Sequence, residues 1–172
     1  MTWPPGDPRG HWSPLFDFYG HLTNQGHHLN VPDAMTLAHA TELAKERPKV
    51  LTPDEQWIVA DTIGEVMRAQ MEFEPDFRIL AGAVERTHTH LLLTGLREPI
   101  DRVIGRFKGR TSSEVIARGS EPGRKRTWTA GFWKVFLFEE RSVPLVERYV
   151  EAHNERRGLP AAPYEWITPT WV

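Results

Sequence analysis

Hydrophobic and polar positions alternate along this chain with two different periods. Four segments have the period-two alternation or the β-branched and aromatic content of strands: residues 15–23, 76–85, 88–95 and 132–139. Four segments have the apolar spacing or end signals of helices: residues 33–46, 52–70, 98–119 and 144–158. This order predicts an α+β protein with a ferredoxin-like β-α-β-β-α-β antiparallel sheet, helices on one face, and a C-terminal helix that carries Tyr149.

Local signals support these elements and place them in one domain. Thr52, Pro53 and Glu55 form the sequence pattern of a capping box with proline at the first helical position. Only two residues separate the second and third strands, which indicates a hairpin. No linker divides the chain, so we expect a single domain over residues 1–172, with a loose arm over 1–13 and an extended tail over 159–172 that packs through its tryptophans.

The composition is that of a globular protein, with 40% hydrophobic and 26% charged residues. The absence of cysteine excludes disulfides, a cysteine nucleophile and thiolate metal sites, and it fits a reducing compartment. The Pro/Gly-rich start is not typical of a signal peptide, and no apolar run has membrane-spanning length. We therefore expect a cytoplasmic protein with no membrane partner.

The charge is unevenly distributed, although the formal net charge is only -2. Residues 102–126 contain two acidic side chains against eight basic ones: Arg102, Arg106, Lys108, Arg110, Arg118, Arg124, Lys125 and Arg126. We call this segment the basic stripe. Such a stripe is typical either of a nucleic-acid contact or of a solvated helix face, and the charge pattern alone does not separate the two.

His88 and His90 form a candidate metal site at the start of the third strand. Residues two apart on a strand share a face, and neutral imidazole is a common metal ligand. Two histidines on a half-exposed strand edge are the alternative interpretation. Two other classes of protein have such pairs, and neither fits. For a metal-dependent amidohydrolase, 172 residues are too few to form the barrel. A two-histidine phosphoesterase would need a second copy of its motif, which the chain lacks.

Further potential ligands lie in the last predicted helix. Tyr149 and His153 are four residues apart and therefore share a face of that helix. Of the three tyrosines, only Tyr149 has a potential metal ligand one turn away. The alternative is that Tyr149 packs in the core and His153 is solvated.

In combination these motifs resemble the single-tyrosine HUH transposases, the insertion-sequence group that includes the REP-associated tyrosine transposases. Four stretches carry the resemblance in the family's order: ILAGAVERTHTHLLL, IGRFKGRTSSEV, WTAGFWKVFLF and YVEAHNERRGLPAAPYEW. Together they span about half the chain. The opening stretch FYGHLTNQGHHLN resembles the family more weakly.

Two positions depart from the family pattern. Thr89 stands where the motif has a bulky apolar residue, and His153 stands where the third ligand is commonly glutamine or asparagine. Threonine is tolerable in a strand. Imidazole is a competent ligand and favours Mn²⁺ or another transition ion over Mg²⁺.

The resemblance implies a metal-dependent transposase that cleaves and rejoins single-stranded or hairpin DNA through a covalent 5′-phosphotyrosine. It assigns Tyr149 as the nucleophile and His88, His90 and His153 as ligands of a divalent metal, Mg²⁺ or Mn²⁺. It also implies a homodimer, in which the tyrosine helix serves either its own or the partner's histidines. The basic stripe would then contact the DNA backbone, while Trp128, Phe132 and Trp133 either stack on bases or, as we favour, fill the core.

Two alternatives stay open at this point. One is a domesticated descendant that binds hairpin DNA without transposing, which the near-neutral charge favours slightly. The other is a non-catalytic α+β domain with structural histidines. If His88, His90, His153 and Tyr149 converge in space, an active enzyme is favoured over both alternatives.

Overall fold

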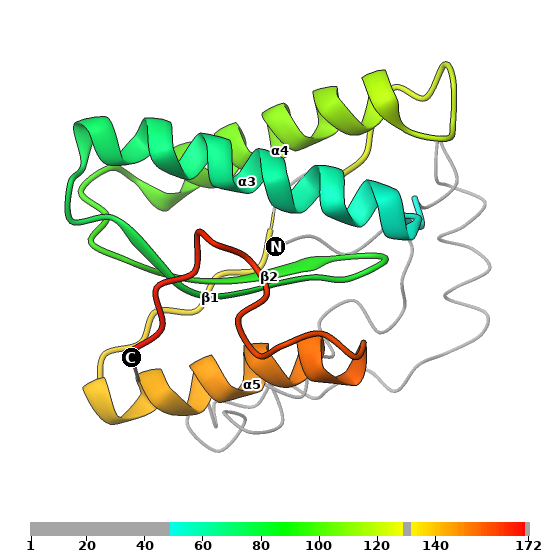
Figure 1. The fold of residues 1–172 in the computed structure, drawn as a ribbon. Coiled ribbons are helices and arrows are strands. Elements are labelled where there is room, and N and C mark those ends of the chain that lie inside the picture. The colour runs from blue at the N-terminus through cyan, green and yellow to red at the C-terminus, as the bar shows by residue number, and fades with distance from the viewer. Residues whose placement is uncertain (1–48, 129–131, 171–172) are drawn as a thin grey trace, which may run out of the picture.

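The computed structural model describes residues 49–128 and 132–170, and within them the chain forms three layers (Figure 1). Helices α3 (Pro53–Phe73) and α4 (Ile100–Arg118) cover one face of an antiparallel pair of strands, β1 (Arg78–Val84) and β2 (Thr89–Thr94). Helix α5 (Val143–Arg156) covers the opposite face and follows a short 3-10 turn, η1 (Glu140–Ser142). None of the helices in this described part is long and apolar enough to cross a membrane.

Helix α3 begins with the capping box that the sequence predicts. The Thr52 side chain accepts a hydrogen bond from the Glu55 amide at 3.2 Å, and the Glu55 carboxylate accepts one from the Thr52 amide at 2.9 Å. These bonds satisfy amide groups that have no partner inside the helix.

Strands β1 and β2 form the predicted hairpin, in which Arg86 and Thr87 make the turn. Val84 pairs with Thr89, and the Glu85 amide donates to the His88 carbonyl at 2.8 Å, so Glu85 and His88 face each other across the turn. This register determines which side chains share a face. Since neighbours along a strand alternate, Glu85, His88 and His90 lie on one face, and Val84 and Thr89 lie on the other.

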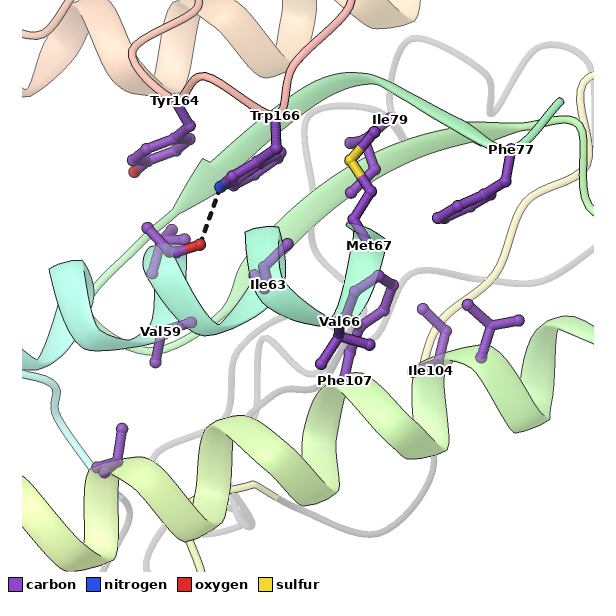
Figure 2. Packing of buried hydrophobic residues seen from close by; sticks show 14 of the residues in the cluster. Val59, Ile63, Val66, Met67, Phe77, Ile79, Ile104, Phe107, Tyr164 and Trp166 are labelled. Atoms are coloured by element: carbon purple, nitrogen blue, oxygen red, sulfur yellow. Dashed lines mark hydrogen bonds between the residues drawn. The ribbon is translucent and has the colours of Figure 1, made fainter. Parts of the chain in front are cut away.

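Each face of the sheet has its own apolar core. The larger core lies between the sheet and helices α3 and α4 and includes Ile63, Phe77 and Phe107, all at most 1% exposed (Figure 2). The smaller core lies under α5, where Ala81 and Ala83 of β1 meet Val146 and Val150 of the helix. Small side chains on β1 allow the helix to approach the sheet closely.

The C-terminal tail packs against the larger core, as the tryptophan content predicts. The Trp166 ring lies against Gly64 of α3 and Gly82 of β1, and a Cβ at either glycine would come within 2.6 Å of it. Its Nε1 donates to the Ala60 carbonyl at 2.8 Å (Figure 2). Ile167 forms a parallel bridge with Ile79.

The predicted strand at residues 132–139 is wrong, since none of these residues is in a strand. Its alternating apolar pattern is compatible with a strand, but a strand also needs a partner within hydrogen-bonding distance. Instead, a cavity of about 710 Å³ is lined by this segment and β2 together. Val135, Phe136 and Phe138 are 50%, 60% and 93% exposed.

Other predicted elements lie outside the described residues: the strand at 15–23, the helix at 33–46 and the arm at 1–13. The described part is mixed helix and sheet, which agrees with the α+β class. The described part contains two of the four strands predicted for the ferredoxin-like sheet and lacks the one at 132–139, so the ferredoxin-like arrangement is not confirmed.

Candidate active site

His88 and His90 lie side by side on the face of the hairpin that α5 covers. Their ring centroids are 4.7 Å apart and the rings are nearly perpendicular. The start of α3 and the residues just before it hold this end of the hairpin. Leu51 donates its amide to the Arg86 carbonyl at 2.7 Å, and Gln56 donates to the Val84 carbonyl at 3.0 Å. The predicted common face of the two histidines is confirmed.

Helix α5 places Tyr149 and His153 beside His88 and His90. The His153 ring lies 4.4 Å from that of His90 and 6.0 Å from that of His88, and the Tyr149 ring lies 5.0 Å from His153 and 5.6 Å from His90. All four side chains belong to one chain. His153 is 7% exposed, so the expectation of a solvated histidine on this helix is excluded.

The end of α5 is fastened to β1 by buried polar contacts. Asn154, which is fully buried, donates to the carbonyls of Gly82 and Ala161, each at 2.9 Å. Arg157 donates to the Val84 carbonyl at 2.5 Å. Breaking these bonds would leave buried polar groups without partners, which would destabilise the folded state. The bonds therefore hold the helix in a defined position over the histidine pair.

The three histidines fit a divalent cation. Their potential ligand atoms all lie within 4.8 Å of one another. The Nε2 atoms of His90 and His153 are buried and have no hydrogen-bond partner among the described residues. An unpaired buried nitrogen is costly, and a metal ion would satisfy both atoms.

The electrostatics of the cluster keep His90 in the form that binds metals. Burial lowers the pKa of His90 well below its usual value, and the neighbouring His88 and His153 disfavour a further positive charge. His90 is therefore neutral at pH 7, with a lone pair available for coordination.

A fifth polar residue, Glu85, joins the cluster, and the sequence interpretation missed it. Its carboxylate lies 2.9 Å from Nδ1 of His153. Burial by itself raises the pKa of Glu85, but the hydrogen bond and charge of His153, with the charges of His88 and Arg157, lower it overall. The signal was present in the hairpin register, because a two-residue turn places Glu85 opposite His88 and on the same face.

Thr89 points away from the cluster into the larger core. It is 1% exposed, and its hydroxyl has no hydrogen-bond partner within the described residues. We expect Thr89→Val to raise the free energy of unfolding by about 1 kcal/mol, because it removes an unsatisfied buried hydroxyl. The midpoint of thermal unfolding would rise by roughly 2–4 °C. Circular dichroism would measure the change, with Thr94→Val at the exposed end of the same strand as the control. A lower midpoint for Thr89→Val would contradict this account.

Comparison with known proteins agrees with the geometry. Residues 35–153 match a family model described as "Transposase IS200 like", which covers more than two thirds of the chain. The chain belongs to the IS200-like transposase family. The match includes both histidines of the hairpin and Tyr149, and it ends at His153. Searches of curated proteins and of solved structures gave no significant match.

In this transposase the basic stripe lies away from the histidine cluster. Helix α4 lies on the opposite face of the sheet from α5 (Figure 1). Arg102 and Arg106 both pair with Glu98, Arg118 pairs with Glu114, and Arg124 pairs with Glu121. These arginines are partly neutralised by their own chain.

The remaining basic residues of the stripe differ in their surroundings. Lys108 is half-buried, and burial lowers its pKa. Arg110, Lys125 and Arg126 are exposed and have no ion-pair partner in residues 49–128 and 132–170. Arg110, Lys125 and Arg126 are therefore the members of the stripe most available to a phosphate backbone.

The aromatic residues near the stripe divide between core and surface. Trp128 and Phe132 pack against the larger core, and Trp128 Nε1 donates to the Thr111 hydroxyl at 2.8 Å. Trp133 is 45% exposed. The preference for the core is confirmed at the first two positions and is wrong at Trp133.

Proposed function

We propose that this transposase cleaves and rejoins single-stranded DNA through a covalent 5′-phosphotyrosine on Tyr149, with a divalent cation bound by His88, His90 and His153. One observation carries the proposal: three imidazoles and a tyrosine ring from separate elements converge, with His90, Tyr149 and His153 ring centroids within 5.6 Å of one another. A non-catalytic domain has no need for such a cluster, and membership of a transposase family favours the catalytic interpretation.

Positioning is the main contribution of the protein to this reaction. Tyr149 is fixed by α5, one turn before His153, and the helix end is held by Asn154 and Arg157. A hydroxyl held in line with a phosphate gains much of its rate advantage from that placement. The bound cation would offset negative charge on the scissile phosphate.

The proposed step exchanges one phosphodiester bond for another. The Tyr149 oxygen bonds to phosphorus, and the bond from phosphorus to the 3′-oxygen of the preceding nucleotide breaks. The phenol gives up its proton to solvent or a base, and the leaving 3′-oxygen takes one up. Because the bond energy is conserved in the phosphotyrosine, a 3′-hydroxyl can reverse the step without ATP.

The direct test uses labelled single strands from the DNA that flanks the gene. We expect a protein–DNA adduct that resists denaturant and forms only with a divalent cation, more with Mn²⁺ than with Mg²⁺ because all three ligands are imidazoles. Duplex DNA of the same sequence should be a poor substrate. Absence of any adduct on every flanking strand, with intact fold and DNA binding, would instead support a domesticated protein that only binds hairpin DNA.

The exposed basic residues after α4 give a second prediction, on DNA affinity. Each phosphate contact to a single strand contributes about 0.7 to the slope of log affinity against log salt. We therefore expect Lys125→Gln with Arg126→Gln to reduce the magnitude of that slope by about 1.4, measured by fluorescence anisotropy over a series of salt concentrations. Arg68→Gln with Arg78→Gln, which removes the same charge from α3 and β1, is the control. An equal slope in both double variants would show that Lys125 and Arg126 do not contact phosphates and that the basic stripe is a solvated surface.

Three further parts of the proposal concern assembly, location and relatedness. We propose that the transposase acts as a homodimer, that it is cytoplasmic, and that it is related to the REP-associated group. Within one chain the tyrosine already lies beside its own histidines, which supports action in cis.

A further inference from the structure

We propose that Glu85 is a positioning residue for the metal centre, one that orients His153 and fixes which of its ring nitrogens binds the cation. This inference rests on the proposed function of the histidine cluster. Its basis is the 2.9 Å contact between the Glu85 carboxylate and Nδ1 of His153.

The contact determines the tautomer of His153. A carboxylate can only accept hydrogen bonds, so Nδ1 of His153 must carry the proton. In the neutral ring Nε2 then holds the lone pair, and this atom is buried without a hydrogen-bond partner among the described residues. The carboxylate therefore leaves Nε2 as the nitrogen of His153 that is free to bind the cation.

Glu85 acts on the histidine rather than on the metal. Among the residues that the structure describes, the compact group of potential ligand atoms consists of His88, His90 and His153 and does not include Glu85. The Glu85 carboxylate contacts Nδ1 of His153, and Nε2 is the ring nitrogen left buried without a hydrogen-bond partner among the described residues. A carboxylate in this position raises the donor strength of the imidazole, and loss of such a partner typically weakens metal binding by about 10- to 100-fold.

The hairpin gives Glu85 a defined position for this role. Glu85 lies next to the two-residue turn, opposite His88, and its amide is hydrogen-bonded to the His88 carbonyl at 2.8 Å. The preceding Val84 carbonyl accepts bonds from Gln56 and Arg157. The same hairpin end therefore sets the first ligand and the group that orients the third.

The test compares three variants by Mn²⁺ binding, measured with calorimetry or electron paramagnetic resonance. We expect Glu85→Ala to weaken Mn²⁺ binding by about 10-fold or more. Glu85→Gln should weaken it less, because the amide oxygen still accepts from Nδ1. Glu155→Gln changes an exposed carboxylate of α5 that pairs with Arg148, and this variant should bind Mn²⁺ as wild type does.

Two readouts distinguish positioning from a general effect on the fold. In the metal-free protein, long-range ¹H–¹⁵N spectra should show a protonated Nδ1 on His153, and Glu85→Ala should shift the ring toward the other tautomer. In a His153→Gln background, Glu85→Ala should have little further effect on Mn²⁺ affinity. A purely structural role would lower the affinity equally in both backgrounds.

The outcomes separate this inference from the proposed function. If wild type binds no Mn²⁺, the metal centre itself is wrong and the inference falls with it. If wild type binds Mn²⁺ and forms the DNA adduct, but Glu85→Ala binds Mn²⁺ as tightly as Glu155→Gln does, only the role of Glu85 is overturned. An unchanged His153 tautomer in Glu85→Ala would overturn it as well.

Discussion

Replacement of Tyr149 by phenylalanine is expected to abolish the covalent protein–DNA adduct while fold, metal binding and DNA binding persist. The change removes one oxygen from a ring that contacts His90 and His153, and no other tyrosine lies in the described cluster. Loss of a nucleophile costs on the order of 10⁶-fold in rate in a well-studied protease, so the adduct should fall below detection. Denaturing gel electrophoresis with labelled single-stranded DNA measures it.

Tyr164→Phe provides a matched control for this experiment. Tyr164 is 7% exposed and stacks on Trp166 with ring centroids 4.8 Å apart, in the layer on the other side of the sheet. This variant loses the same single oxygen, and we expect it to form the adduct. An adduct on the Tyr149→Phe protein would show that Tyr149 is not the nucleophile and that the proposed role of α5 is wrong.

Replacement of His88 by alanine is expected to give the second largest effect, on the metal. His88 is half-buried, directly precedes β2 and belongs to neither apolar core, so its removal should leave both cores intact. With two imidazoles left, Mn²⁺ affinity should fall by at least about 100-fold, beyond the effect of losing an outer partner. Mn²⁺-dependent cleavage should be lost with it.

Calorimetric titration with Mn²⁺ and the adduct assay check this prediction, with thermal unfolding to verify the fold. Thr94→Ala, at the exposed end of the same strand, is the control and should behave as wild type. Added imidazole should restore part of the cleavage by His88→Ala. Unchanged Mn²⁺ binding and cleavage in this variant would exclude His88 as a ligand.

The site shows which features follow from local sequence. A strand places residues i and i+2 on one face, and a helix places residues i and i+4 on one face, so the pairs His88–His90 and Tyr149–His153 were predictable from spacing. Backbone geometry alone imposes these relations. The capping box at Thr52 and Glu55 was predictable for the same reason, since its hydrogen bonds join residues three apart.

Other features depended on contacts between distant segments. The segment at 132–139 has a pattern compatible with a strand, but a strand forms only where a partner backbone lies within hydrogen-bonding distance, and none of these residues is in a strand. The exposed Trp133 likewise reflects where the segment lies, not its sequence. Local pattern gives the capacity to pair, and tertiary packing decides whether pairing occurs.

Thus the sequence by itself determined two pairs of residues that share a face, His88 with His90 and Tyr149 with His153, and the capping box of α3. It also carried the resemblance to a transposase family, which the family match confirmed. Only the tertiary structure decided that the two pairs meet, because 62 residues lie between His90 and His153 and no periodicity acts over that separation. Packing of α5 on the small residues of β1 brings them together. The same packing brings Glu85 to Nδ1 of His153, although these two residues lie far apart in the sequence and in different elements.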